Sequence, residues 1–286
     1  MDAPLIGANL WIWESPVTTD VIRTYAPRIA TWGFDLIELP VEQPGDWSVG
    51  EVRPLLGELG LRAGVCAVMA PGRDLTSDDA SVVRSTQDYL RACIDAAHEV
   101  GAEVVAGPAY SPTGATGPIP PAARATLLER LSANLAPVLE HAASAGVKIG
   151  VEPLNRFETS LFNTVEQTMA LIEHVDHPSL GLLLDTFHMN IEERDPGAAI
   201  RRAGDRLVHF HACGNDRGAP GHDAIDWIAI RDALADIDYR GAVSIESFTS
   251  ANQTIATAAS IWRPLAPTQD DIAAEGLSFL RGLLGS

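Results

Sequence analysis

Two hydrophobic periodicities alternate along the chain. Short apolar runs, typical of buried strands, occur eight times, and the segments between them carry apolar residues at helical spacing. The strand-like runs lie at residues 6–13, 36–40, 63–69, 104–110, 148–155, 180–185, 207–214 and 242–248. The helical segments lie at residues 20–33, 49–60, 82–102, 124–146, 164–175, 228–237 and 270–284. Several of these segments close on a glycine, as helix C-termini commonly do: Gly33, Gly60, Gly101 and Gly146.

This alternation predicts an α/β fold, a (β/α)₈ TIM barrel that forms a single catalytic domain over residues 1–286. No Pro/Gly/Ser-rich linker or low-complexity stretch interrupts the pattern. A doubly wound sheet is the alternative. Such sheets commonly carry a nucleotide-binding loop, but no GxGxxG opens a helix and no GxxxxGK followed by Ser or Thr occurs. Because catalytic residues of TIM barrels lie at the carboxyl ends of the strands, the functional residues are expected there.

Composition and charge narrow the range of partners. The chain is 46% hydrophobic and 20% charged, as in ordinary globular proteins, and no apolar run reaches the ~18 residues of a membrane span. The N-terminal MDAPLIGANLW lacks a secretory pattern and the three cysteines form no CxxC pair, so a cytoplasmic enzyme is expected. The net charge of −18 disfavours nucleic acid and membrane surfaces and favours a small substrate, neutral or carried by a metal ion.

Residues able to bind a metal end the last four strand-like runs. Glu152, Asp185, His211 and Glu246 occupy corresponding positions on consecutive strands. Neighbouring strands are about 4.8 Å apart, so their inward side chains can converge, and three carboxylates in one space need a neutralising cation. This oxygen-rich set suits Mn²⁺, Mg²⁺ or Co²⁺; the alternative is that one or two of the residues cap helices or pair with arginine. His209 is expected one layer deeper, as a core or supporting residue.

Other chemistries common on this fold lack their residues. The only lysine, Lys148, starts a strand and therefore lies at the wrong rim for a Schiff base, and no GxSxG nucleophile elbow is present. Cys213 has no evident activating partner. Metal-assisted acid/base chemistry remains. A metal ion chelated by a ketone oxygen and an adjacent hydroxyl would acidify the proton on the carbon between them. Either Glu152 or Glu246 removes this proton to form an enediolate, and the other returns a proton to the opposite face of the carbon, which inverts its configuration.

Polar residues on the loops beyond these strands can orient a polyhydroxylated ligand. They are Asn155, Arg156, Glu158, His188 and Arg217. In LLLDTFHMNIEE, His188 is expected on a loop, and Glu192 and Glu193 in a solvated connection to the next helix. Four large side chains are candidates for the pocket lining and equally for plain core: Trp13, Met69, Tyr110 and Trp262.

Four stretches, VEPLNRFETSLFNT, LLLDTFHMNIEE, HACGNDRG and SIESF, resemble the ketose 3-epimerases, a group of xylose-isomerase-like barrels that contains D-tagatose, D-allulose (D-psicose) and L-ribulose 3-epimerases. GFDLIELP and SIWRPLAPTQDDIAAEGLSFL extend the similarity over nearly the whole chain. The resemblance implies C3 epimerisation of free ketoses by a homodimer or homotetramer with bound Mn²⁺ or Co²⁺. Carried over by motif, the metal ligands are Glu152, Asp185, His211 and Glu246, with Glu152 and Glu246 as the acid/base pair. The implied substrate-binding residues are Glu158, His188 and Arg217.

One departure keeps other reactions open. After the strand-seven histidine the epimerases typically read HIGESHRG, whereas here Gly214 stands where the glutamate is expected. Relatives with the same metal ligands act as lyases on oxidised sugars, as dehydratases or in cleaving 3-oxo-glycosides, and an aldose–ketose isomerase is a further alternative. A DNA-repair endonuclease on this fold would need more histidines and a basic face, and a non-catalytic sugar-binding barrel is the last alternative.

Overall fold

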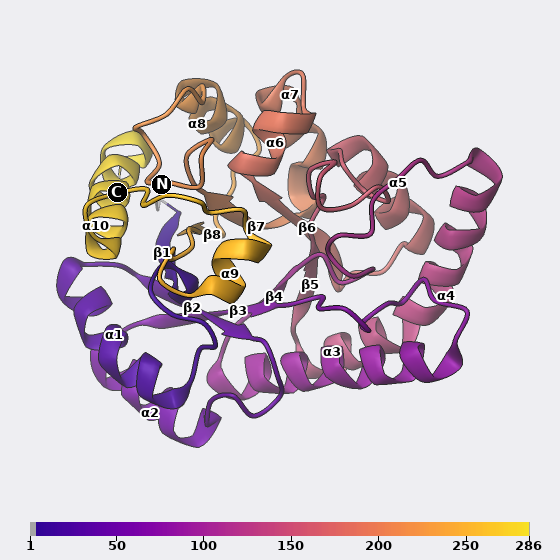
Figure 1. The fold of residues 1–286 in the computed structure, drawn as a ribbon, viewed down its shortest axis with the longest axis horizontal. Coiled ribbons are helices and arrows are strands. Elements are labelled where there is room, and N and C mark those ends of the chain that lie inside the picture. The colour runs from indigo at the N-terminus through magenta and orange to yellow at the C-terminus, as the bar shows by residue number, and fades with distance from the viewer. Residues whose placement is uncertain (1–3, 286) are drawn as a thin grey trace.

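Eight parallel strands close into a barrel in the computed structural model of the protein, which describes residues 4–285 except for the side chain of residue 254 (Figure 1). The strands follow one another around the barrel in sequence order, and β8 pairs with β1. They are β1 Leu5–Asn9, β2 Leu36–Val41, β3 Arg62–Ala67, β4 Val104–Gly107, β5 Lys148–Val151, β6 Leu180–Asp185, β7 Leu207–Ala212 and β8 Ala242–Ile245. The predicted TIM barrel is confirmed. Residues 1–3 and 286 of the predicted domain lie outside the described residues.

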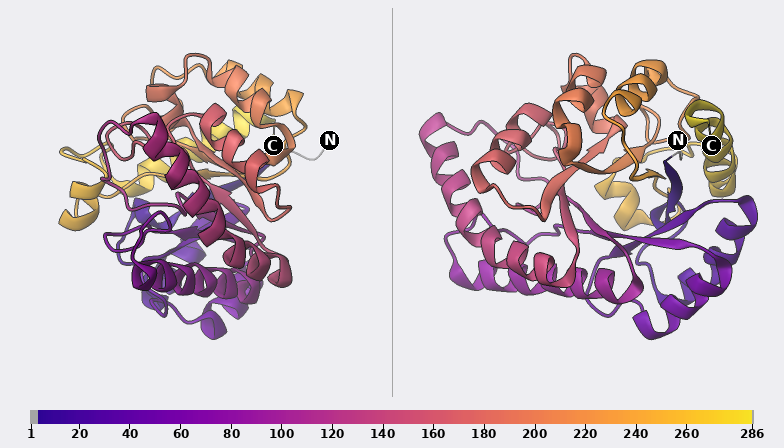
Figure 2. Two further views of the ribbon diagram at one scale, coloured as in Figure 1. Left: turned by 90° about the vertical axis from the view of Figure 1, so that its right-hand side faces the viewer. Right: turned by 180° about the vertical axis from the view of Figure 1, so that it is seen from behind.

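Helices surround the barrel, and α3 packs against α4 on one side (Figures 1 and 2). The longer helices are α1 Thr19–Trp32, α2 Val49–Leu59, α3 Ala80–Val100, α4 Pro121–Ala145, α5 Val165–Val175, α8 Trp227–Asp236 and α10 Gln269–Leu284. The shorter helices are η1 Leu10–Ile12, α6 Thr186–Glu192, α7 Pro196–Ala203, η2 Gly204–Arg206 and α9 Gln253–Ala258. Every helical segment expected from periodicity is a helix. The short helices were not predicted, because segments of at most eight residues show too little of the 3.6-residue period.

Several strands end before the apolar runs do. β4 stops at Gly107, whose φ of +139° lies outside the strand region, and not at residue 110. β5 stops at Val151 because Pro153 lacks the N–H that would continue the ladder. β1 gives way to η1, and the side chain of Asn9 accepts a hydrogen bond from the Trp11 N–H at the start of that helix. The residues that follow these strands are therefore free to turn into the barrel mouth.

The predicted glycine helix ends are confirmed. The residues that follow α1, α2, α3 and α4 all adopt the left-handed conformation, in which the absence of a Cβ removes the usual steric cost. Each backbone N–H at these positions donates to a carbonyl in the last turn of its helix. These sharp endings return the chain directly to the next strand.

Apolar side chains fill both faces of the barrel wall. Leu182, Leu183 and Leu184 of β6 are all 0% exposed, so this strand is covered inside by the barrel core and outside by helices, as is usual for parallel sheets. Within residues 4–285, no helix combines the length and the apolar character needed to cross a membrane.

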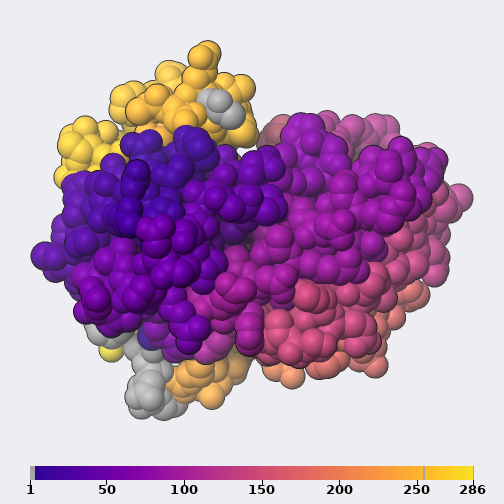
Figure 3. Space-filling model, turned by 90° about the horizontal axis from the view of Figure 1, so that it is seen from below, coloured from indigo at the N-terminus to yellow at the C-terminus, as the bar shows by residue number. Residues whose placement is uncertain are grey.

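The segment that contains α9 stands out from the face that looks toward the viewer in Figure 1. Figure 2 shows the same segment, coloured yellow-orange, at the edge of the molecule, and Figure 3 shows it raised above the neighbouring surface. Ile255, Ala258 and Ala259 of this segment line a cavity that Glu152 and Glu246 also line. The segment therefore covers the carboxyl ends of the strands.

Candidate active site at the carboxyl ends of the strands

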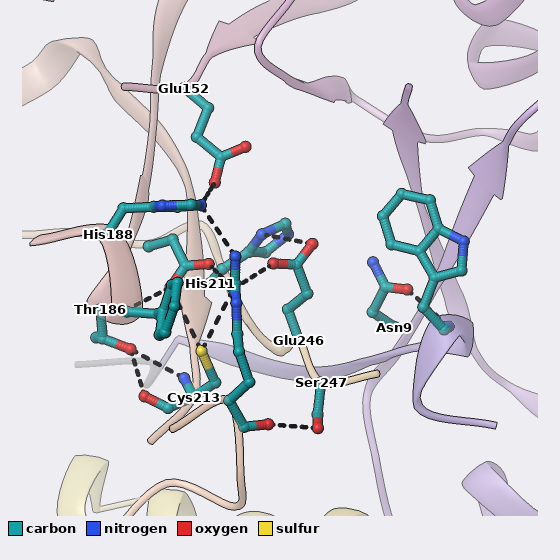
Figure 4. A network of polar contacts seen from close by, with 12 residues as sticks. Asn9, Glu152, Thr186, His188, His211, Cys213, Glu246 and Ser247 are labelled. Carbon is teal, nitrogen blue, oxygen red and sulfur yellow. Dashed lines mark hydrogen bonds and ion pairs between the residues drawn. The ribbon is translucent and has the colours of Figure 1, made fainter. Parts of the chain in front are cut away.

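The four residues predicted to bind a metal lie together. Asp185 ends β6, His211 lies in β7, and Glu152 and Glu246 directly follow β5 and β8. Asp185 and His211 are register partners across the two strands. One possible ligand atom from each of the four residues lies within 4.8 Å of the others. Figure 4 shows how Glu152, His211 and Glu246 point toward the same region.

Burial leaves two polar atoms of this cluster without partners. The exposed fractions of the four residues run from 0% for His211 to 6% for Glu152. Among the described residues, Oε1 of Glu152 and Nδ1 of His211 have no hydrogen-bond partner. Buried polar atoms are nearly always paired, because an unpaired one costs about 1–3 kcal/mol. These two atoms therefore point to a ligand that the chain itself does not supply.

The two glutamates differ in their electrostatic environment. Burial, together with the nearby Glu246, raises the pKa of Glu152 well above the ordinary range of a carboxyl group. Burial alone would also raise the pKa of Glu246, but His211 and Arg217 lower it to about 2. Two neighbouring carboxyl groups whose pKa values are shifted apart can serve as a proton donor and a proton acceptor.

Arg217 is buried beside the cluster. Its Nη1 donates to Oε2 of Glu246 over 2.8 Å and also to Oδ2 of Asp185. Its Nη2 lies 3.0 Å from Nε2 of His188, and its guanidinium carbon lies 4.2 Å from the ring centroid of Phe187. The guanidinium thus neutralises part of the carboxylate charge and holds two members of the cluster in place.

His188 lies on α6, so the prediction of a loop at this position was wrong. The side chain of Asp185 accepts a hydrogen bond from the Phe187 N–H over 2.7 Å and caps a helix that starts directly after the strand. Asp185 therefore both belongs to the cluster and sets the direction in which His188 projects.

Asn155 connects the predicted substrate-binding residues. Its backbone N–H donates to Nδ1 of His188 over 3.0 Å, and its side-chain Nδ2 donates to Oε1 of Glu158 over 2.8 Å. Nε2 of His188 lies 3.6 Å from Oε1 of Glu152. Burial and the charge of Arg217 lower the pKa of His188 to about 3, so its imidazole is neutral near pH 7. The loop after β5 and helix α6 are thus joined above the cluster.

Glu192 and Glu193 lie outside the cluster. Glu193 begins the connection to α7 and is partly exposed, as expected, but Glu192 belongs to α6 and its side chain is buried, so the prediction of a solvated connection was wrong for Glu192. Oε1 of Glu192, at the end of α6, accepts hydrogen bonds from the backbone N–H and the Nε of Arg156, over 2.7 and 2.9 Å. Oε1 of Glu193 accepts the Val165 N–H at the start of α5 over 2.7 Å. Both side chains secure neighbouring segments of the site.

A cavity of about 140 Å³ opens above the cluster. Its charged and imidazole lining consists of Glu152, Glu158, His188, Arg217 and Glu246. Its apolar lining includes Trp11, Met69, Leu154, Phe248 and Ile255. Of the large side chains predicted either to line a pocket or to form core, Met69 lines this cavity, Trp13 and Tyr110 are buried away from it, and Trp262 is 86% exposed. The cavity combines polar groups with an apolar wall, as small-molecule sites usually do.

Glu38 is a buried residue beside the cluster that was not predicted. It is 0% exposed, and its carboxylate lies 2.9 Å from Nε2 of His211 and 2.7 Å from Nε2 of His209. Burial alone would raise the pKa of Glu38, but the two histidines lower it, so the carboxylate is ionised. His209 occupies the deeper layer expected for it. The one signal for Glu38 was an acidic residue inside the apolar run LIELP.

The positions of Cys213 and Lys148 disfavour a nucleophilic role for either residue. Sγ of Cys213 is 3.4 Å from Oδ1 of Asp185, and burial raises the pKa of this thiol well above its usual range. A protonated thiol is a poor nucleophile. Lys148 begins β5, at the rim opposite the cluster.

Known proteins resemble the chain over almost its whole length. A family model for the xylose isomerase-like TIM barrel matches residues 27–283. A Synechocystis sp. protein named "Probable ketose 3-epimerase" is 36% identical over 277 residues, which cover 96% of this chain and 95% of that protein. An L-ribulose 3-epimerase of Methylomonas sp. is 31% identical over 278 residues, which cover 96% of each. A solved structure of L-ribulose 3-epimerase superposes with a TM-score of 0.93 and 32% identity, covering 99% of this chain and 95% of that one.

Proposed function

The chain belongs to the xylose isomerase-like TIM-barrel family and, within it, to the ketose 3-epimerases, and from this membership we propose that it is a metal-dependent enzyme that inverts C3 of a free ketose. One observation carries the proposal. Glu152 and Glu246 both line the cavity and both belong to the buried cluster with Asp185 and His211. Two carboxyl groups that border one small cavity can act on both faces of a single carbon.

The cluster fits a divalent cation. Glu152, Asp185 and Glu246 offer carboxylate oxygens and His211 offers one imidazole nitrogen, a set that suits Mn²⁺, Co²⁺ or Mg²⁺, of which Mn²⁺ is the ion we propose. The unpaired atoms of Glu152 and His211 support this assignment. When bound, such an ion would supply Lewis-acid stabilisation of the negative charge that develops on the ketose oxygens as the C3 proton leaves.

The two glutamates divide the proton transfer. A carboxylate oxygen of one accepts the C3 proton, and the carboxyl group of the other donates a proton to C3 from the opposite face. In the metal-free site the pKa of Glu152 is raised and that of Glu246 is lowered, so the two carboxyl groups differ in proton affinity. In the reverse direction the two residues exchange roles, so one pair serves both epimers.

Glu158, His188 and Arg217 would orient the sugar. All three line the cavity, and each is already held by a neighbour: Glu158 and His188 by Asn155, and Arg217 by the carboxylate of Glu246. Side chains held in advance lose little freedom when they bind a hydroxyl or a carbonyl oxygen. The segment with α9 covers the cavity, which reduces the access of water to the reacting carbon.

Incubation with three free ketoses tests the proposal. The protein, supplied with Mn²⁺, is given D-fructose, D-tagatose or L-ribulose in ²H₂O, and the products are separated and examined by ¹H NMR. We expect the C3 epimer of at least one of them, with deuterium at C3, because a carboxyl proton exchanges with solvent before it is delivered. No C3 epimer from any of the three sugars would reject the proposal.

Two variants assign the reaction to the site. Glu246→Gln should lower kcat by about 10²- to 10⁴-fold, the usual contribution of a general acid or base. Glu275→Gln is the matched control, because Glu275 lies on the surface of α10 with a side chain that is 48% exposed. Unchanged turnover in Glu246→Gln would favour a protein that only binds sugar.

A lyase that acts on an oxidised sugar is the second candidate, and the loop after β7 supports it. Gly214, where epimerases typically carry glutamate, donates its N–H to the Gly218 carbonyl over 2.9 Å in a tight turn. A Cβ at Gly214 would lie 3.2 Å from Oδ1 of Asp216 and 3.3 Å from the Ala219 carbonyl oxygen, so this loop fits glycine better than a larger residue. Cleavage of a 3-oxo-glycoside, without epimerisation of any ketose, would select this candidate.

A further inference from the structure

Glu38 contacts the side of His211 that faces away from the proposed metal centre. Its Oε2 and Oε1 lie 2.9 and 3.1 Å from Nε2 of His211. Glu38 belongs to β2 and His211 to β7, which are not neighbours in the barrel, so the contact crosses the barrel interior. We infer that Glu38 is a positioning residue that determines which nitrogen of His211 faces the centre. This inference rests on the proposed function, because it assumes that the centre binds a metal.

The two nitrogens of His211 have different surroundings. Nε2 faces a carboxylate, which can only accept a hydrogen bond, so Nε2 carries hydrogen. Nδ1 lies 3.4 Å from Oε1 of Glu246 and has no hydrogen-bond partner among the described residues. A neutral imidazole with hydrogen on Nε2 has its lone pair on Nδ1, directed toward Glu246 and the rest of the cluster. Glu38 thus stabilises the tautomer, and the ring orientation, that a metal ligand needs.

Glu38 is itself held from several sides. Nδ2 of Asn9 donates to its Oε2 over 2.9 Å, and Asn9 is fixed in turn by the Trp11 N–H, which donates to its Oδ1 over 2.9 Å. Nε2 of His209 lies 2.7 Å from Oε1 of Glu38. On the neighbouring strand, Gly64 is the register partner of Glu38, and a Cβ there would lie 3.5 Å from Cγ of Glu38. The carboxylate therefore has one well-defined position from which to hold His211.

Glu38 acts on the metal centre and not on the sugar. It does not line the cavity of about 140 Å³ in which Glu152, Glu246 and Arg217 meet the substrate. A loss of Glu38 should therefore weaken metal binding while leaving the KM for the ketose unchanged at saturating metal. Removal of a group that supports a metal-ligating histidine typically costs about 10- to 100-fold in metal affinity.

The experiment measures Mn²⁺ affinity and the state of His211 in the full-length protein. Calorimetry gives the Mn²⁺ dissociation constant of wild type, Glu38→Gln, Glu38→Asp and a control, Ser244→Ala. Ser244 is 0% exposed and is the register partner of His211, but its hydroxyl has no hydrogen-bond partner among the described residues. We expect about 10- to 100-fold weaker binding in Glu38→Gln, a smaller loss in Glu38→Asp, which keeps the carboxylate, and no change in Ser244→Ala.

NMR of ¹⁵N-histidine-labelled protein loaded with diamagnetic Zn²⁺ shows which nitrogen of His211 carries hydrogen. A purely structural role of Glu38 would not change this result. In wild type we expect hydrogen on Nε2 of His211, slow to exchange with solvent, and the metal on Nδ1. Faster exchange of this proton in Glu38→Gln would support the inference. Wild-type spectra with the metal on Nε2 would overturn it even if both Glu38 variants failed to fold.

Other outcomes separate this inference from the proposed function. If wild type binds Mn²⁺ and epimerises ketoses but Glu38→Gln binds Mn²⁺ equally well, the role of Glu38 is overturned and the proposed function stands. If wild type binds no metal, both are overturned. Glu38, His209 and His211 also lie close enough to hold an ion themselves, so binding of two ions, one of which is lost in Glu38→Gln, would make Glu38 a ligand and overturn the inference.

Discussion

Nη1 of Arg217 donates to Oε2 of Glu246 over 2.8 Å, so a residue predicted to bind substrate contacts a residue predicted to bind metal and move a proton. The same Nη1 also donates to Asp185. A guanidinium presents its donors in a rigid plane, and this geometry holds two carboxylates at a fixed separation. Metal binding, proton transfer and substrate orientation therefore depend on one another in this site.

Replacement of Arg217 by lysine should impair catalysis although the charge is kept. An ammonium group cannot reproduce the planar donors with which the Arg217 guanidinium contacts Glu246 and Asp185, so at least one charge-assisted hydrogen bond is lost. Such a bond is worth about 1.5–3 kcal/mol, which corresponds to a fall in kcat/KM of about 10- to 150-fold. Steady-state kinetics on the preferred ketose measure the change.

Arg263→Lys is the matched control for Arg217→Lys. Arg263 pairs with Asp216 over 3.0 Å, but the side chains are 45% and 43% exposed. Exposed ion pairs contribute little, so kcat/KM should not change. An equal effect of the two substitutions would contradict the role assigned to Arg217.

Removal of metal should lower stability as well as activity. Without a cation, Glu152, Asp185 and Glu246 are crowded in a buried cluster, where ionised carboxylates repel one another and the pKa of Glu152 is raised, although His211 and Arg217 offset part of the negative charge. Mn²⁺ at 100 times its dissociation constant would add about 2.7 kcal/mol to the free energy of unfolding. Thermal melts of chelator-treated protein, with and without added Mn²⁺, measure the difference. Asp185→Asn should abolish most of the Mn²⁺-dependent rise in Tm, and an identical Tm with and without Mn²⁺ in wild type would contradict the proposed centre.

The cluster could be predicted from sequence because the order of the strands determines which residues lie close together. In a parallel barrel the carboxyl ends of consecutive strands meet at one rim, so Glu152, Asp185, His211 and Glu246 are brought together by position along the chain alone. No such rule connects Glu38 to His211. They are 173 residues apart on strands that do not pair, and their contact depends on which side chains cross the barrel interior.

The position of His188 shows a second limit of sequence patterns. The sequence shows that Asp185 ends a strand. It does not show whether this side chain caps a following helix, belongs to the cluster, or does both, as it does in the structure. A helix of seven residues has too few turns for a periodic signal, so a loop was the natural prediction. The same holds for the six-residue helix α9, of which Ile255 and Ala258 line the cavity.

The contact between Arg156 and Glu192 should strengthen substrate binding. It joins the loop after β5, which carries Glu158, to α6, which carries His188. Glu192→Gln removes the carboxylate that accepts from the Arg156 side chain. We expect a raised KM with little change in kcat, because the groups that orient the sugar become less fixed while the acid/base pair is untouched. Kinetics at saturating Mn²⁺ test this, and a lower kcat at unchanged KM would contradict it.

The same pair predicts a dependence of stability on pH. Burial alone would raise the pKa of Glu192, but the hydrogen bonds from Arg156 lower it below its ordinary value of 4.5. Because the pKa is lower in the folded state, the pair stabilises the protein above pH 4.5, and this stabilisation is lost as the pH falls through the folded-state value. The effect should be small, because the Arg156 side chain is 62% exposed. The Tm of wild type should exceed that of Glu192→Gln at pH 7 and approach it at low pH; a gap that widens on acidification would have the wrong sign.

Replacement of glycine by alanine should lower the free energy of unfolding at one position and raise it at another. Gly107 ends β4 and lines the cavity with a φ of +139°, and an added Cβ would lie 2.5 Å from the Ala67 carbonyl oxygen, which the strand holds in place. Gly107→Ala should therefore lower the free energy of unfolding by at least ~1–3 kcal/mol. Gly57 lies on the exposed side of α2 with nothing within 4 Å of an added Cβ, so Gly57→Ala should raise it by ~0.5–1 kcal/mol. Urea unfolding measures both, and stabilisation by Gly107→Ala would show that the backbone between β4 and the cavity can rearrange.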